Sequence, residues 1–164
     1  MFRDIALYIH VPFCRRKCPY CSFVSYDHRE TDISLYLSAL KKELIRRAGG
    51  ACTRSIYFGG GTPSLLSVKH VGDLISAISS LFNVDEAAEI TIEANPVTIN
   101  REYLTAIREL GVNRLSLGVQ SLNDRELALL GRNHTVVEAR DAVQRARDSG
   151  IDNLSIDLIY GLPG

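Results

Sequence analysis

Strand-like and helix-like segments alternate along the whole chain, and this alternation is the feature that most constrains its fold. Apolar residues at helical spacing predict helices over residues 33–45, 68–81 and about 101–110, followed by two short helices that begin near 123 and 135. Short apolar runs between them predict strands at 5–11, 55–58, 89–96, 113–121 and about 153–159. Such alternation is typical of an α/β fold with a parallel sheet.

A weak internal repeat supports the same fold class. "GVNRLSL" from Gly111 and "GIDNLSI" from Gly150 match in pattern at a period of 39 residues. In each, a glycine ends a helix and a strand follows, which is the unit of a parallel (β/α) barrel or a doubly wound sheet. We predict one domain over residues 1–164 with about five βα units. Because an eight-stranded barrel needs three more strands, we expect the N-terminal portion of a partial (β/α) barrel, incomplete at residue 164 and unstable alone.

The charge balance argues against several classes of partner. The 19 Lys and Arg residues equal the 19 Asp and Glu residues, so no basic surface for nucleic acid is predicted. No apolar run has the length of an integral membrane segment, and "MFRDIALYIHVPF" is not typical of a signal peptide. Four cysteines without an export signal favour a reducing compartment, and we predict the cytoplasm.

Three of the cysteines are bunched in "FCRRKCPYCSF", and three chemistries fit their spacing. Cys18 and Cys21 alone would suit a redox dithiol, which needs a helix N-terminus to lower the thiol pKa. A zinc site would need a fourth ligand, with His10, His28 or Cys52 as candidates. Cys14, Cys18 and Cys21 together would suit an iron–sulfur cluster, since thiolates are its usual ligands.

Polar residues also fall just after the predicted strands. "GGGTPS" follows the second strand, Glu93 and Gln120 end the third and fourth, and Asp157 lies near the end of the fifth. In parallel β/α folds, ligands bind at the carboxyl ends of the strands. We therefore expect one ligand site there. Arg132 could bind a carboxylate of the ligand through its planar guanidinium group.

The motifs "YIHVPFCRRKCPYCSF", "YFGGGTPS", "IEANP", "RLSLGVQS", "LGRNH" and "IDLIYGLPG" together resemble the coproporphyrinogen dehydrogenase/HemW family of the radical S-adenosylmethionine superfamily. The resemblance implies a [4Fe-4S] cluster on Cys14, Cys18 and Cys21, whose open iron binds the amino and carboxylate groups of S-adenosylmethionine. Matched motif by motif, it implies cofactor contacts from Tyr8, Tyr20, Ser22, Gly60, Gly61, Thr62, Glu93, Gln120, Arg132 and Asp157.

Two departures from the oxidase pattern distinguish the branches of this family. Porphyrinogen oxidases carry a fourth cysteine where Phe23 stands here, and they carry an extension ahead of the barrel, whereas thirteen residues precede Cys14. The resemblance to the HemW branch implies a heme chaperone, with heme as ligand, a heme-acceptor protein, and an electron donor of the flavodoxin or ferredoxin type. Oxidative decarboxylation of coproporphyrinogen III and a related methyltransferase stay open as alternatives, as does a zinc-stabilised domain without catalysis.

Overall fold

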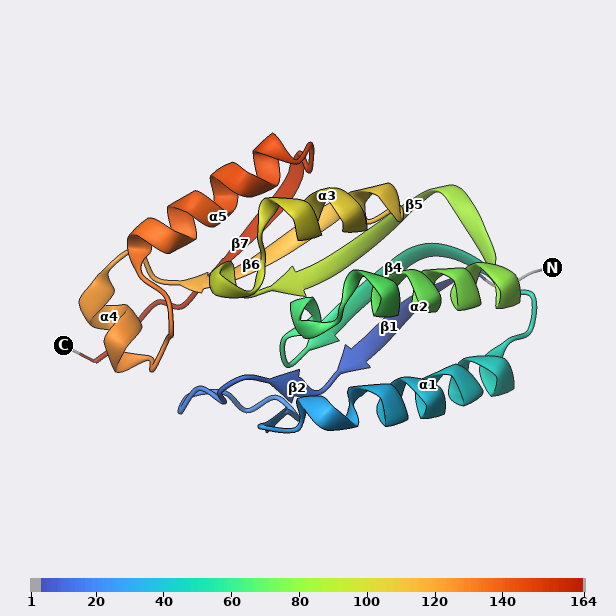
Figure 1. Cartoon of the computed structure of the whole chain (residues 1–164), viewed down its shortest axis with the longest axis horizontal. Coiled ribbons are helices and arrows are strands. Elements are labelled where there is room, and N and C mark those ends of the chain that lie inside the picture. Colours follow the sequence, from blue (N-terminus) through green and yellow to red (C-terminus); the bar gives the residue numbers. More distant parts are fainter. Residues whose placement is uncertain (1–3, 164) are drawn as a thin grey trace.

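The computed structural model describes residues 4–163 and consists of a five-stranded parallel sheet with helices on one face (Figure 1). The strand order is β1-β4-β5-β6-β7, and all neighbouring pairs are parallel. The strands are β1 Asp4–Val11, β4 Cys52–Gly60, β5 Asn83–Ala94, β6 Arg114–Gln120 and β7 Asn153–Leu158. Every connection carries a helix, as a parallel sheet requires, so the predicted α/β class is confirmed.

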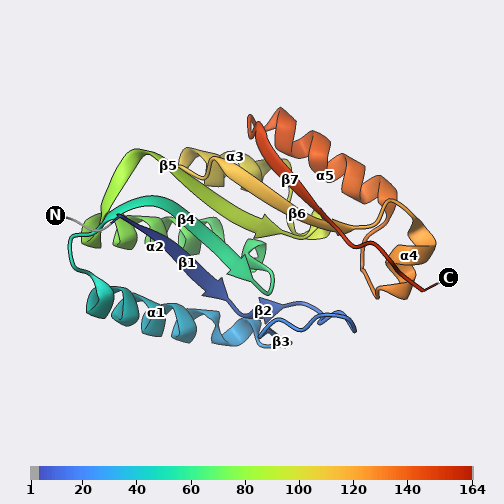
Figure 2. The same ribbon diagram turned by 180° about the vertical axis from the view of Figure 1, so that it is seen from behind.

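The helices cover one face of the sheet and leave the other bare over the described residues (Figures 1 and 2). Neighbouring helices contact one another in the order α1, α2, α3, α5. The α-helices are α1 Ile33–Arg47, α2 Val68–Leu81, α3 Arg101–Glu109, α4 Asp124–Leu129 and α5 Val136–Asp148. Three short 3-10 helices lie in the connections: η1 Glu30–Asp32, η2 Pro63–Leu65 and η3 Pro96–Thr98.

Side-chain alternation along the strands gives the sheet two different faces. In β4, Ile56 and Phe58 are 1% and 0% exposed and belong to the core under the helices, whereas Tyr57 between them is half-buried on the bare face. In β5, Ile92 is in the same core and its neighbour Glu93 is half-buried. Since successive side chains of a strand point to opposite faces, the bare face carries polar groups from each strand.

The five strands end at one edge of the sheet. Val11 pairs with Gly60, Ala94 with Leu117, and Gln120 with Leu158, so the carboxyl ends of all five strands lie side by side. The loops that follow them form a common rim, as the sequence predicts. β1 and β7 are at opposite edges and do not pair with each other, which agrees with a partial barrel.

Several predicted boundaries were wrong. β4 and β5 are longer than predicted: β4 includes Gly59 and Gly60, whereas β5 begins at Asn83 and ends two residues before Pro96, where a 3-10 helix starts. The second predicted short helix is α5, with 13 residues.

The N-termini of three helices are capped in different ways. Thr135 and Glu138 form a capping box at the start of α5. Asn123 does cap α4, but Glu126 accepts a hydrogen bond from the Ser121 hydroxyl instead of completing a box. Asp32 occupies the N-cap position of α1, yet its carboxylate accepts from Arg29 and not from the helix.

The core under the helices dictates a first prediction, on stability. Ile92 lies in β5, the central strand, and is 0% exposed. Ile92→Ala should lower the free energy of unfolding by about 2–5 kcal/mol, because it removes buried methylenes and leaves a cavity. Urea titration followed by circular dichroism measures this. Val137→Ala, at a site 64% exposed, is the control and should change it by less than about 0.5 kcal/mol. Equal effects of the two variants would contradict the core assignment.

Candidate functional site

A cleft of about 460 Å³ opens at the carboxyl edge of the sheet. It is lined by residues from the loop after β1, from the ends of β4, β5, β6 and β7, and from the segment after α4. The predicted site residues that line it are Cys14, Cys18, Tyr20, Cys21, Gly60, Gly61, Thr62, Glu93, Gln120, Arg132 and Asp157. The structure thus gathers residues more than a hundred positions apart in one concave site.

The three clustered cysteines lie on one wall of this cleft as free thiols. Cys14 ends the two-residue strand β2 (Phe13–Cys14), which pairs with β3 (Tyr26–Asp27) in a separate two-stranded sheet and so brings the two ends of the cysteine loop together. Cys14 is buried, and the Thr62 hydroxyl donates to its sulfur at 3.6 Å. Cys18 and Cys21 are half-buried and share a turn, in which the Cys21 amide donates to the Cys18 carbonyl at 3.0 Å.

Gly61 permits the cysteine loop to approach the end of β4. A Cβ atom at Gly61 would lie 2.6 Å from the Phe13 carbonyl oxygen and 3.0 Å from the Cys14 sulfur, so only glycine fits there. The Gly61 amide donates to the Val11 carbonyl at 2.8 Å, and the Thr62 amide donates to that of Phe13 at 2.7 Å. The glycine run therefore holds two backbone segments together beside the first cysteine.

Glu93 is anchored at the centre of the cleft. The Tyr57 hydroxyl donates to one of its carboxylate oxygens at 2.8 Å, and the Gly60 amide donates to the other at 2.9 Å. Burial, together with the adjoining Glu93 carboxylate, raises the pKa of Tyr57, so the hydroxyl stays a donor at neutral pH. Sequence reasoning missed Tyr57. The sequence feature that could have identified Tyr57 is its position just before the glycine run, on the polar side of β4.

Asp157 is held by a second network on the bare face. The Ser116 hydroxyl donates to the Asp157 carboxylate at 3.2 Å, and the Ser155 hydroxyl donates to Ser116 at 2.9 Å. Arg114 donates in turn to Ser155 at 3.0 Å and to Thr91 at 3.3 Å. The network crosses β5, β6 and β7. It orients the Asp157 side chain, even though Asp157 belongs to β7, an edge strand of the sheet. None of its supporting residues was predicted.

Arg132 links the far wall of the cleft to the cysteine loop. Its guanidinium donates to the Gly118 carbonyl at 2.6 Å and lies 3.5 Å from the Cys18 sulfur and 3.4 Å from the Tyr20 hydroxyl. Burial raises the pKa of Tyr20 to about 12, against the opposing effect of the Arg132 charge. The Nε of Arg132 is buried without a partner among the described residues, so this side chain retains a donor for a ligand.

Two predicted contacts lie outside the cleft lining. Tyr8 is 57% exposed and stacks on Tyr57, with ring centroids 5.8 Å apart. Burial and the nearby Glu93 charge raise the pKa of Tyr8. Ser22 is exposed on the cysteine loop and does not line the cleft. Tyr8 thus lies against Tyr57, which does line the cleft.

The two competing hypotheses for the cysteines are less well supported. Cys52 pairs with Asp4 at the amino edge of the sheet, opposite to Cys14, and the His10 Nε2 is engaged by the Val24 carbonyl at 2.8 Å. Over residues 4–163, no group of three or more His, Cys, Asp or Glu side chains is arranged around a single metal ion. The dithiol hypothesis needs a helix at Cys18, whereas the first α-helix begins at Ile33.

Comparison with known proteins agrees with this arrangement. The Radical SAM superfamily model matches residues 8–164. The chain belongs to the radical SAM superfamily. It is 40% identical over 157 residues to the heme chaperone HemW of Lactococcus lactis, covering 96% of this chain and 41% of that protein. It is also 40% identical over 161 residues to the mitochondrial radical S-adenosyl methionine domain-containing protein 1 of Bos taurus, covering 96% and 36%.

Solved structures give the same result. Coproporphyrinogen III oxidase (HemN) from Escherichia coli, described as a radical SAM enzyme, superposes with a TM-score of 0.91 at 34% identity, over 99% of this chain and 38% of that chain. The hydrogenase maturase HydG from Carboxydothermus hydrogenoformans shares the fold, with a TM-score of 0.69 at 20% identity. The chain spans about two fifths of the length of these relatives. No helix among residues 4–163 is long and apolar enough to cross a membrane.

Membership in the superfamily implies a [4Fe-4S] cluster and S-adenosylmethionine, and the cleft fits both. Three free thiols on one loop supply the donor set of a cluster with one open iron. The glycine run leaves backbone groups accessible, and Glu93 and Asp157 supply acceptors for ammonium or hydroxyl groups.

His134 generates a prediction on pH dependence. It is buried, and its Nε2 donates to the Val119 carbonyl at 3.0 Å. Burial, with the Arg132 charge, lowers the pKa of His134. Below about pH 6.5 the unfolded chain therefore binds a proton more readily than the folded chain, and stability falls with decreasing pH by at most about 1.4 kcal/mol per unit.

Urea titrations between pH 7 and pH 5 measure this contribution. His134→Gln, which keeps an N–H donor, should reduce the loss of stability across that range, and His28→Asn, at an exposed histidine, should leave it unchanged. If the His134 variant and the parent lost the same stability between pH 7 and pH 5, the His134 imidazole would not be the group that controls this loss.

Proposed function

We propose that this protein is a HemW-like heme chaperone, which binds heme and passes it to an acceptor protein, with a cluster and S-adenosylmethionine in the cleft at the carboxyl edge. The observation that carries this is the 40% identity to proteins named heme chaperone HemW over 96% of the chain. Phe23 supports it, because its side chain is 66% exposed and lines the cleft where the oxidases of the family place a fourth cysteine. We place this activity in the cytoplasm.

We assign Cys14, Cys18 and Cys21 as the ligands of the [4Fe-4S] cluster. When bound, the cluster and cofactor supply one-electron cleavage of the sulfonium to methionine and a 5′-deoxyadenosyl radical. In this proposal the chain's own residues bind and orient the cofactor. Glu93 and Asp157 accept hydrogen bonds, Arg132 offers its free Nε, and Tyr20 shields the cysteine loop. Tyr8 and Ser22 are proposed to act from outside the cleft lining.

The alternative is oxygen-independent coproporphyrinogen III oxidation. The TM-score of 0.91 to the Escherichia coli oxidase favours it, because nearly the whole chain superposes on that enzyme. A related radical methyltransferase shares the same cysteine motif and is the third candidate.

The deciding experiment tests heme binding and porphyrinogen turnover on one preparation. The protein is reconstituted anaerobically with iron and sulfide, reduced, and supplied with S-adenosylmethionine and coproporphyrinogen III, and products are separated by chromatography. We expect no decarboxylated porphyrinogen. The same preparation should bind heme in an absorbance titration and lose it to apo-acceptor proteins such as heme-free respiratory enzymes.

Protoporphyrinogen formed with stoichiometric 5′-deoxyadenosine would instead establish the oxidase and overturn the chaperone proposal. Cys14→Ser is the control for cluster integrity. It removes one of the three proposed thiolates, so iron and sulfide content should fall to background, while Cys52→Ser at the amino edge should retain both.

Tyr57 supports a prediction on cofactor affinity. Tyr57→Phe removes the hydroxyl that donates to Glu93 and leaves the Gly60 amide as the remaining donor to this carboxylate among residues 4–163. The loss of one hydrogen bond to a charged group, about 1.5–3 kcal/mol, should weaken S-adenosylmethionine binding by roughly tenfold or more. Isothermal titration calorimetry on the reconstituted protein measures it.

The matched control is Tyr26→Phe, which removes an exposed tyrosine hydroxyl outside the cleft and should not change the dissociation constant. Unaltered binding in the Tyr57 variant, at normal iron content, would show that Glu93 is not oriented by this contact.

A further inference from the structure

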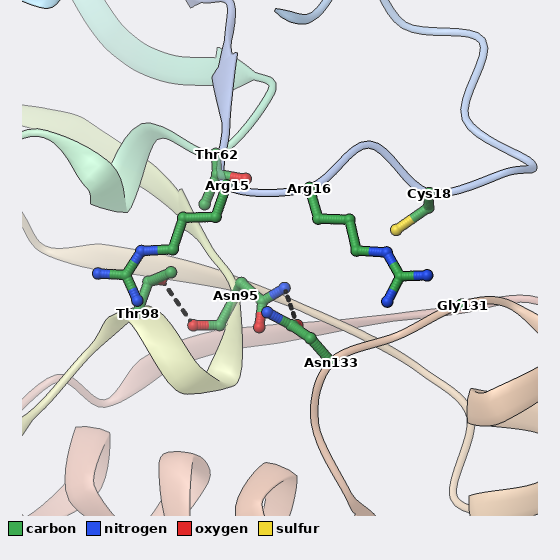
Figure 3. A pocket seen from close by; sticks show the side chains of 8 residues that line it. All are labelled: Arg15, Arg16, Cys18, Thr62, Asn95, Thr98, Gly131 and Asn133. Atoms are coloured by element: carbon green, nitrogen blue, oxygen red, sulfur yellow. Dashed lines mark hydrogen bonds between the residues drawn. The ribbon is translucent and has the colours of Figure 1, made fainter. Parts of the chain in front are cut away.

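The hydroxyl of Thr62 has an unusual partner for its place in the chain. Thr62 follows the glycine run at the end of β4 and occupies the N-cap position of the 3-10 helix η2 (Figure 3). A threonine hydroxyl at an N-cap normally accepts a hydrogen bond from the first turn of its helix, but the Thr62 side chain makes no such bond to η2. It donates to the Cys14 sulfur at 3.6 Å instead. The side chain is therefore directed to the first cysteine and not to its own helix.

The backbone around Thr62 holds this hydroxyl against the sulfur. The Thr62 amide donates to the carbonyl of Phe13, the residue before Cys14, at 2.7 Å, and the Thr62 carbonyl accepts from the Leu65 amide at 3.0 Å. Pro63 begins η2, is buried, and has a backbone angle φ restricted by its ring. Thr62 is thus fixed on both sides by backbone contacts, so its hydroxyl reaches the Cys14 sulfur before any ligand is bound.

The surroundings of the Cys14 sulfur strengthen the contact. Cys14 is buried, so little water competes with Thr62 for the sulfur, and a hydrogen bond is stronger where water is excluded. Among the described residues, the Thr62 hydroxyl donates to no other acceptor. Arg132 also lies near a cysteine, at 3.5 Å from the Cys18 sulfur, but its guanidinium donates to the Gly118 carbonyl as well. Thr62 thus differs from Arg132 because it is a neutral donor that serves one sulfur alone.

We propose that Thr62 is a positioning residue that raises the reduction potential of the cluster through its hydrogen bond to the Cys14 sulfur. This inference rests on the proposed function, in which Cys14 is a cluster ligand. One-electron reduction adds a negative charge that the cysteine sulfurs share, and a hydrogen-bond donor stabilises the more negative form. Thr62 therefore favours the reduced state, from which the proposed cleavage of S-adenosylmethionine starts.

This role is separate from the cofactor contact that the family resemblance implies for Thr62. A contact with S-adenosylmethionine would change the affinity for the cofactor and would need the cofactor in the cleft. The hydrogen bond to the Cys14 sulfur is present without any ligand, so its effect on the cluster does not require S-adenosylmethionine. A reduction potential measured in the absence of the cofactor therefore isolates the contact with the sulfur.

The test measures the reduction potential of the reconstituted protein without S-adenosylmethionine or heme. Dithionite supplies one electron per cluster in the presence of redox mediators, and electron paramagnetic resonance quantifies the reduced cluster. Thr62→Val keeps the shape of the side chain and removes the donor. It should shift the one-electron equilibrium about three- to tenfold toward the oxidised cluster, which lowers the potential by about 30–60 mV, since a tenfold change is about 59 mV. Thr62→Ser keeps the hydroxyl and should retain the parental potential.

Thr98→Val is the matched control. The Thr98 hydroxyl donates to the Asn95 backbone carbonyl at 2.8 Å (Figure 3) and is hydrogen-bonded to the Ser64 hydroxyl of η2. The substitution therefore removes a threonine hydroxyl that supports the same helix, and it should leave the potential unchanged. An equal shift in this variant would show that loosening of η2, and not the hydroxyl of Thr62, sets the potential, and would overturn the inference.

The parental potential in Thr62→Val at full iron content would also overturn it. If the valine variant takes up no cluster, Thr62→Ala is the second variant without a hydroxyl. It should show the lowered potential, and the parental potential there would overturn the inference as well. A parent that takes up no cluster would refute the proposed function and this inference with it. Porphyrinogen turnover by the parent would refute only the chaperone proposal, because no porphyrinogen or heme enters the measurement of the potential.

Discussion

The two-residue alternation of side chains along five parallel strands is the constraint on which the rest of this structure depends. In β4, Phe58 packs under the helices while Tyr57, its neighbour, reaches the cleft. The same strand therefore buries apolar surface, worth about 25 cal/mol per Å², and presents a polar group to the site. A shift of one residue in register would move every side chain of a strand to the opposite face of the sheet. The packing of the core therefore also determines which residues line the cleft.

The polar face is organised before any ligand binds. Glu93 is held by a tyrosine hydroxyl and a backbone amide, and Asp157 by a chain of hydroxyls that ends at Arg114. A bond between neutral groups is worth about 0.5–1.5 kcal/mol net, and a bond to one of the carboxylates about 1.5–3 kcal/mol. The larger effect is orientation, because a carboxylate fixed in advance loses less conformational freedom when a cofactor binds.

The order of strands and helices, and the edge at which the site lies, could be predicted from sequence because they follow from local periodicity and from the geometry of parallel sheets. The supporting residues could not. Ser116 and Ser155 are 39 positions apart and meet only because β6 and β7 pair in one register. Asn123 and Glu126 have the spacing of a capping box, yet the Glu126 carboxylate accepts a hydrogen bond from the Ser121 hydroxyl instead, so spacing alone does not decide which donor a carboxylate binds.

The position of the cysteine loop depends on one close approach between two backbone segments. Gly61 lets the Phe13 carbonyl and the Cys14 sulfur lie against the end of β4, where a methyl group would collide with both. The β2–β3 pairing then closes the loop, and Arg132 reaches Cys18 from the other wall. With both ends fixed, the loop presents its three thiols to the cleft, where Arg16 also contributes to the lining. The contact at Gly61 therefore fixes where all three thiols lie relative to the carboxyl ends of the strands.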